Sequence, residues 1–174
     1  MNFFGGYKMK RKISLLLIAA LCVFALAACG SGSSSSDAVV IPDDGYSFTY
    51  NGVTIEMHAL ADDVIEALGD YESYYEETSC SFEGIDKTYD YGSFYITTYP
   101  DGDVDYIFTV WFSDDTVATE EGISIGSSSD EVEAVYGTDF YNGSNAYIIE
   151  SGEMTLTIIM SDDTVGSIQY TASF

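Results

Sequence analysis

The chain has 174 residues, with 29 Asp and Glu against five Lys and Arg and a formal net charge of −24. Nucleic-acid binding depends on lysines and arginines that neutralise phosphates, so this charge argues against DNA, RNA and anionic lipid headgroups as direct ligands. It favours cations, basic peptides and basic protein surfaces as partners, and it is equally typical of a protein whose acids serve solubility.

Residues 1–28 have the three zones of a secretory signal peptide. A basic stretch that includes Lys8 and Lys12 precedes an apolar run from Ile13 to Ala28. That run is shorter than the roughly 20 residues that span a bilayer, although a short uncleaved membrane anchor is the alternative. In either case the rest of the chain is predicted to lie outside the cytoplasm.

The apolar run ends in Leu26-Ala27-Ala28-Cys29, which resembles the lipobox of bacterial lipoproteins. The resemblance implies cleavage between Ala28 and Cys29 and acylation of Cys29, where two or three acyl chains anchor stably. Residues 29–40 are then the lipidated cysteine and a flexible linker rich in Ser and Gly. The mature side chains would comprise Lys87 against 29 acids, a charge of −28.

An internal repeat organises the remaining chain, which has the length of one ordinary domain. The sequence Ser-Asp-Asp-Thr-Val occurs at 113–117 and again at 161–165. A short element with a helical pattern lies upstream of each copy. We therefore predict two units, one over 41–119 and one over 120–174.

Each unit is predicted to begin with a short helix. In the first, Leu60, Val64 and Leu68 form one apolar stripe, and a glycine follows. In the second, Ser128 and Glu131 have the spacing of a capping box, again with a glycine at the C-terminal end. Helices of about ten residues are marginal alone, so both are expected to pack on a sheet.

Strands are predicted where apolar and polar residues alternate. This pattern runs through 104–112 and 154–160, and turn residues separate these segments from further strands at 93–99 and 145–150. The additional residues of the first unit, after its helix, are expected to form a loop or strand pair. The predicted fold class is α+β, with two tandem repeats of a helix followed by an antiparallel meander.

This arrangement resembles the tandem units of the β-lactamase inhibitor protein family and, more distantly, small outer-membrane assembly lipoproteins of the SmpA/OmlA type. Its signature here is GISIGSSSDEVEAVYG at 122–137, with the looser GVTIEMHALADDVIEALG at 52–69. Members of these families bind other proteins through sheet or loop surfaces, so the resemblance implies a binding role. The disulfides of the inhibitor proteins are absent, and no contact residue carries over by motif.

No catalytic motif stands out in the sequence. His58 is the single histidine and Cys80 the single cysteine after Cys29, too few for the usual zinc ligands or a persuasive nucleophile–base pair. The alternating acids at 101–105 resemble a calcium loop, but Tyr106 stands where that loop needs glycine. We therefore predict no enzyme, cofactor or specific metal site. A small carboxylate-based envelope hydrolase and loose divalent-cation binding are the alternatives.

Aromatic residues supply the candidate binding surface, because they give large contact areas at low entropic cost and are enriched in interfaces. The alternative is that these rings fill and edge the sheet. The sequence thus predicts a non-enzymatic, surface-anchored lipoprotein with a binding or envelope role, attached to the membrane by lipid and recognising a protein or basic peptide. The candidate surface consists of Tyr74, Tyr75, Tyr89, Tyr91, Tyr95, Tyr99 and Trp111.

Overall fold

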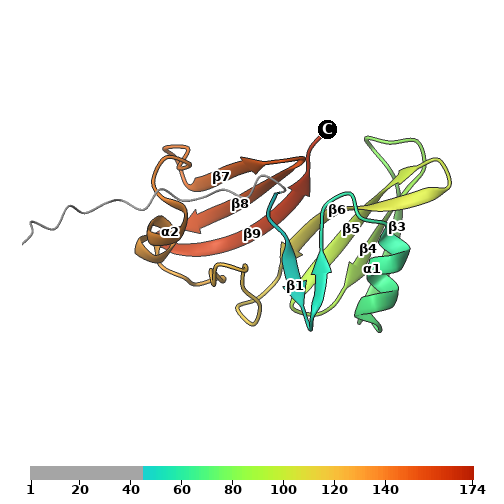
Figure 1. Ribbon diagram of the computed structural model, residues 1–174, viewed down its shortest axis with the longest axis horizontal. Coiled ribbons are helices and arrows are strands. Elements are labelled where there is room, and N and C mark those ends of the chain that lie inside the picture. The colour runs from blue at the N-terminus through green and yellow to red at the C-terminus, as the bar shows by residue number, and fades with distance from the viewer. Residues whose placement is uncertain (1–44) are drawn as a thin grey trace, which may run out of the picture. The chain divides into compact units, whose positions relative to one another are not determined.

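The computed structural model describes residues 45–174 (Figure 1). The predicted signal peptide, the cleavage site at Ala28 and Cys29, and the linker of residues 29–40 lie outside the described residues. Seven strands form one antiparallel sheet in the order β3-β4-β5-β6-β9-β8-β7. In chain order the strands are β3 (Ser73–Thr78), β4 (Ile85–Asp90), β5 (Phe94–Asp101), β6 (Val104–Phe112), β7 (Ala146–Ser151), β8 (Met154–Ser161) and β9 (Thr164–Ala172).

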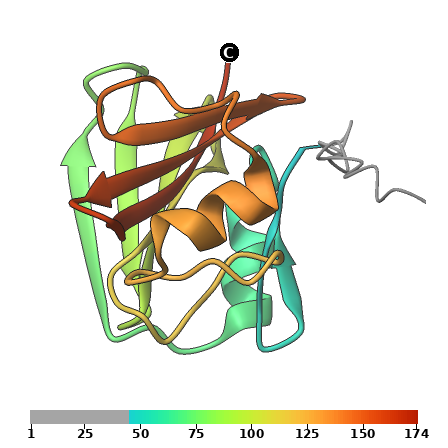
Figure 2. The same ribbon diagram turned by 90° about the vertical axis from the view of Figure 1, so that its left-hand side faces the viewer.

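One face of this sheet is covered and the other is largely open. Four shorter elements lie on the covered face: β1 (Phe48–Tyr50), β2 (Val53–Ile55), α1 (Ala61–Leu68) and α2 (Ser129–Tyr136). Figure 2 shows this layering, with the helices and the β1–β2 hairpin on the same side of the strands. Side chains therefore alternate between a buried core and a solvent-facing surface along each central strand.

The predicted α+β class of two helix-plus-meander repeats is wrong. Strands account for 48% of the described residues and helices for only 12%, so the fold is mostly β. Each helix has eight residues, too few to form a layer of its own. The strands after each helix also pair with one another through β6 and β9, where Thr109 faces Thr171 and Trp111 faces Gln169. A single sheet with one core results.

The strands predicted at 93–99, 104–112, 145–150 and 154–160 are present, and Gly69 and Gly137 end the two helices as predicted. In β8, Met154, Leu156, Ile158 and Met160 are buried, as their alternation indicates. The additional segment of the first unit forms the β3–β4 hairpin. The predicted alternation holds only in the C-terminal half of β6, because a bulge shifts the β5–β6 register between Thr97 and Thr98. In the N-terminal half Ile107 is buried and Val104 is exposed, the reverse of the prediction.

The capping box of α2 makes its stability depend on pH. The Ser128 hydroxyl accepts a hydrogen bond from the Glu131 backbone N–H, and the Glu131 carboxylate accepts from the Ser128 N–H at 2.7 Å. Hydrogen bonds from the Ser128 backbone and hydroxyl lower the pKa of Glu131. A lowered pKa in the folded state means that the carboxylate stabilises the fold at neutral pH, and that this contribution is lost as pH falls through that pKa.

We expect Glu131→Ala to destabilise the domain at pH 7, with a difference in stability from wild type that narrows as pH falls through the lowered pKa of Glu131. Urea unfolding at several pH values measures this difference. Asp130→Ala is the control, because Asp130 lies in the same helical turn outside the capping box. A difference for Glu131→Ala that stays constant from pH 7 to pH 3 would contradict the role of its charge.

A buried hydroxyl in β9 offers a stabilising substitution. Tyr170 is fully buried, and within residues 45–174 its hydroxyl has no hydrogen-bond partner. Because an unpaired buried polar group costs free energy, Tyr170→Phe is expected to raise the free energy of unfolding by about 1 kcal/mol. Chemical denaturation checks the sign, and a loss of stability would indicate that the hydroxyl is satisfied. Tyr136→Phe is the matched control, because the Tyr136 hydroxyl donates a hydrogen bond to Glu121. This variant is expected to destabilise the domain.

Candidate binding face

The open face presents two rows of uncharged side chains across the four central strands β5, β6, β9 and β8. The strand register defines both rows. None of the eight residues is charged, although the chain contains 29 acids. The first row is Thr97, Thr109, Thr171 and Thr155, and the second is Tyr95, Trp111, Gln169 and Thr157.

An aromatic pair occupies the middle of this face. Tyr95 and Trp111 are cross-strand partners, with ring centroids 5.7 Å apart and planes inclined by 33°. The Trp111 indole N–H donates to the Ser167 hydroxyl at 2.9 Å, which fixes the ring while 48% of the residue stays exposed. Fixed aromatic rings that remain accessible are well suited to recognition, because little conformational entropy is lost when they are covered.

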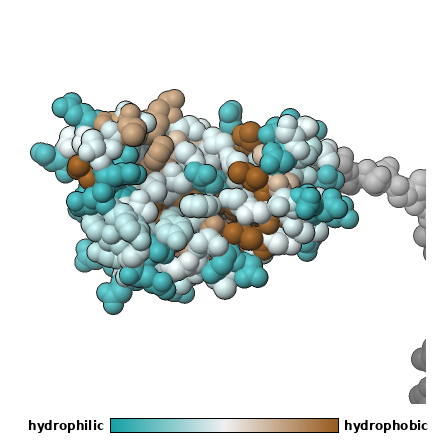
Figure 3. All heavy atoms as spheres, turned by 180° about the vertical axis from the view of Figure 1, so that it is seen from behind, coloured by the Kyte–Doolittle hydropathy of each residue, from teal (hydrophilic) through white to brown (hydrophobic). Residues whose placement is uncertain are grey.

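The aromatic pair borders a shallow hollow of about 580 Å³. Figure 3 looks on to the sheet from the side opposite the helices, where pale and brown residues occupy much of the middle and hydrophilic ones gather mainly towards the rim. The hollow thus offers hydroxyl, amide, aromatic and aliphatic groups without a charge. Its lining consists of Thr88, Tyr95, Thr97, Thr109, Trp111, Ile159, Ser167 and Gln169.

Two exposed isoleucines extend the uncharged surface towards β7. Ile159 lines the hollow and is 39% exposed, and Ile148 of β7 is 41% exposed. Ile148 faces Thr157 in the strand register, so it continues the row that contains Trp111. Aliphatic side chains contribute to binding mainly when they are removed from water, so these residues favour a partner with an apolar surface.

Carboxylates stand at opposite ends of the two rows. Within residues 45–174 the only Lys or Arg is Lys87, which pairs with Asp105 at 2.5 Å. Asp90 and Glu150 stand at the β4 and β7 ends of the two rows. The negative field therefore acts at the rim of the open face, while its centre is uncharged.

The structure divides the predicted aromatic surface between three places. Tyr95 and Trp111 lie together on the open face, and Tyr75 lies on the same face in line with the threonine row, because it faces Thr88. Tyr74, Tyr89 and Tyr91 belong instead to a cluster of rings on the covered face around Tyr71.

Tyr99 occupies the third place, at a corner of the sheet. Its ring is buried against Phe82 and Phe174, with centroids 4.9 and 5.0 Å away. The threonines, Ser167 and the two isoleucines are residues of the face that the aromatic pattern alone does not identify.

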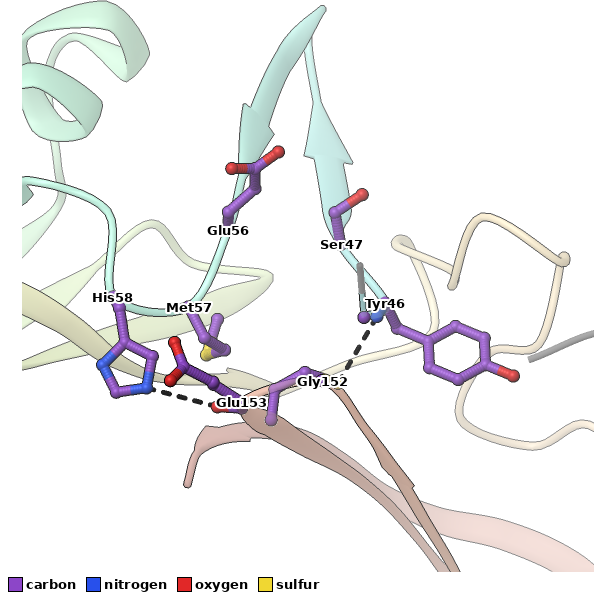
Figure 4. Close-up of a pocket in the computed structure, with 9 residues that line it drawn as sticks. Tyr46, Ser47, Glu56, Met57, His58, Gly152 and Glu153 are labelled. Carbon is purple, nitrogen blue, oxygen red and sulfur yellow. Dashed lines mark hydrogen bonds between the residues drawn. The ribbon is translucent and has the colours of Figure 1, made fainter. Parts of the chain in front are cut away.

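A second hollow, of about 360 Å³, lies between the segment after β2 and the β7–β8 turn. Figure 4 shows His58 directed from that segment towards Glu153 of the turn. The His58 Nε2 atom is 3.2 Å from the Glu153 carbonyl and 3.1 Å from the Ser173 carbonyl, and Nδ1 is 2.8 Å from the Tyr99 hydroxyl. Because carbonyls only accept, Nε2 carries a hydrogen, and in the neutral ring Nδ1 then accepts from the Tyr99 hydroxyl.

His58 therefore connects parts of the chain that are far apart in sequence, and its backbone has a positive φ of 64°. We expect His58→Ala to lower the free energy of unfolding by about 1–3 kcal/mol, because several hydrogen bonds are lost. His58→Gly should be the more stable of the two variants by roughly 1 kcal/mol, because glycine adopts positive φ without strain. Equal stabilities of the two variants in urea unfolding would contradict the backbone argument.

Comparison with protein-family models, curated proteins and solved structures finds no match for this chain. The resemblances noted in the sequence stay predictions. Neither helix in residues 45–174 has the length and apolar character required to cross a bilayer.

Proposed function

We propose that the protein is an extracytoplasmic lipoprotein, anchored by acyl chains on Cys29, that recognises a protein or peptide partner through the open face of its sheet. The role is binding rather than catalysis. The observation that carries the proposal is the uncharged hollow around Tyr95 and Trp111 on an otherwise strongly acidic domain. Charged residues are depleted and aromatic residues enriched at the centres of protein interfaces.

The composition of the face supports a protein or peptide in preference to other ligands. Ile148 and Ile159 lie beside the aromatic pair, and exposed aliphatic side chains of this kind suit an apolar anchor on a partner. The hollow is broad and shallow, a shape that suits a side chain on a protein surface better than an enclosed small molecule.

The acidic rim supports a partner with basic residues around its anchor. Carboxylates such as Asp90 and Glu150 would attract that partner at long range, and the uncharged centre would supply the close contacts. Salt screens exposed charges over about 8 Å at physiological ionic strength. We therefore expect the association rate to fall as salt rises, with a smaller effect on dissociation.

Anchoring rests on the sequence of the first 40 residues. Cleavage before Cys29 and acylation of its thiol would place the domain at a membrane surface, with residues 29–40 as a tether. A Cys29→Ser variant expressed in the native host is expected to lose palmitate incorporation, and palmitate labelling that persists in it would contradict acylation at this residue.

Site-specific photo-crosslinking in intact cells tests the recognition face. A photoreactive amino acid replaces Gln169 on the open face in one variant, and replaces the exposed Glu66 of α1 in a matched control. We expect a discrete crosslinked product from position 169 alone, and loss of that product when Trp111→Ala is added. Equal products from both positions, or none from position 169, would contradict the proposal.

A further inference from the structure

The two edges of the sheet differ in how their backbone is paired. At the β7 edge, residues 140–142 cover the strand: the Ile148 N–H donates to the Phe140 carbonyl at 3.0 Å, and the Asn142 N–H donates to the Ala146 carbonyl at 2.8 Å. At the other edge, all six residues of β3 pair with β4. Within residues 45–174 no backbone segment pairs with the outer side of β3.

β3 retains the features of a strand that can accept another strand. Its six residues pair with β4 in a continuous register without a bulge, and the strand contains no proline. Five of the six residues are exposed, including Tyr75 at 59%. Proteins usually protect a free edge by shortening, kinking, covering or charging it, and the only one of these protections on β3 is the charge of Glu76 and Glu77.

The charge on β3 selects among possible partners. Glu76 and Glu77 are consecutive, so they project to opposite faces of the sheet. Lys87 stands opposite Glu76 in the register, but its ammonium pairs with Asp105 instead. Within residues 45–174 neither glutamate has a cationic partner, and pairing with a second copy of this acidic chain is opposed by like charge.

We propose that β3 binds an extended, basic segment of a partner protein as an eighth strand of the sheet. Two adjacent basic residues of that segment face Glu76 and Glu77, and β-branched or aromatic residues pack on Tyr74 and Tyr75. Main-chain hydrogen bonds supply the part of the affinity that does not depend on the partner's sequence, and the cross-strand side-chain pairs supply the selectivity.

This edge is a site separate from the aromatic hollow. Strand β4 lies between β3 and the central strands, and Trp111 is three strands away. Tyr75 nevertheless continues the threonine row, so an added strand would lengthen the same open face. The inference does not depend on recognition at Trp111, and either site can fail without the other.

Hydrogen exchange of the full chain in detergent tests the proposal, with a synthetic peptide as the probe. The peptide acetyl-Thr-Lys-Lys-Val-Val-Thr-amide places its lysines against the two glutamates in an antiparallel register. Its control, acetyl-Thr-Lys-Lys-Pro-Pro-Thr-amide, has the same charge but cannot form a strand. We expect slower exchange of the β3 amides with the first peptide at millimolar concentration, and no change with the second or at β7.

Two variants separate this site from the hollow. The double substitution Glu76→Gln and Glu77→Gln is expected to weaken binding of the lysine peptide by roughly 2- to 30-fold, the range for two cross-strand charge pairs. Trp111→Ala is expected to leave it unchanged. Unaltered exchange at β3, equal effects of both peptides, or indifference to the double substitution would overturn the proposal.

Discussion

Replacement of Trp111 by alanine is expected to weaken binding of the partner identified by crosslinking by at least about 30-fold. A tryptophan at the centre of an interface is a typical hot spot, where truncation costs about 2 kcal/mol or more. Trp111 is half exposed and makes one side-chain hydrogen bond, to Ser167, so its loss should change the free energy of unfolding by less than about 1 kcal/mol. Isothermal titration calorimetry and urea unfolding measure the two quantities.

Tyr141→Ala is the matched control for this prediction. Tyr141 is 42% exposed, close to the value for Trp111, but it lies beside the β7 edge rather than in the hollow. The Tyr141→Ala variant should bind the partner with nearly wild-type affinity. If both variants lost affinity equally, aromatic exposure in general rather than the hollow would account for binding.

Phe48→Ala is expected to have the largest effect on stability, a loss of about 3–5 kcal/mol. Phe48 belongs to the β1–β2 hairpin and is only 1% exposed. Its ring contacts Phe94 and Phe112 of the sheet, with centroids 5.0 and 4.8 Å away. The deletion leaves a cavity that the surrounding strands cannot close, because rings from β5, β6 and β9 surround it, the last being that of Tyr170.

The neighbouring Tyr50 provides the comparison for this effect. Tyr50 is only partly buried in the same hairpin, so Tyr50→Ala should cost clearly less than Phe48→Ala. Urea unfolding of both variants measures the difference. A loss below about 1 kcal/mol for Phe48→Ala would mean that the hairpin does not close the core.

Local structure could be predicted where a short pattern is sufficient to specify it. Ser128, Glu131 and Gly137 define the ends of α2 through their own hydrogen bonds and backbone preference, and the structure has the capping box as expected. The alternation in β8 likewise identified its core residues, because a residue period of two fixes which side is buried. These signals depend on neighbours within a few residues.

The fold class could not be predicted in the same way, because it depends on pairing between distant segments. The repeated Ser-Asp-Asp-Thr-Val illustrates this dependence. At 161–165 it forms the β8–β9 turn, with Asp162 at a positive φ of 55°, whereas at 113–117 it leads from β6 into an irregular loop. Identical residues adopt different structures because β9 follows one copy and no strand follows the other directly.

The candidate site was predicted in part for a related reason. Tyr95 and Trp111 share a face because antiparallel register brings them opposite each other. Tyr74 and Tyr75 are adjacent in sequence and therefore point to opposite faces, which composition cannot reveal. The threonine row could have been identified from the alternating Thr residues, such as Thr155 and Thr157 in β8, had strand order been known.

Fluorescence of Trp111 tests recognition by the open face most directly, because Trp111 is the only tryptophan in the chain and lies beside the hollow. The measurement is a titration of this protein with the purified partner that crosslinking identifies. The partner must contain no tryptophan, or its tryptophans must be replaced beforehand. Binding at this face predicts a shift of emission to shorter wavelength and reduced quenching by acrylamide. Saturated binding with unchanged emission and unchanged quenching would show that the partner binds elsewhere.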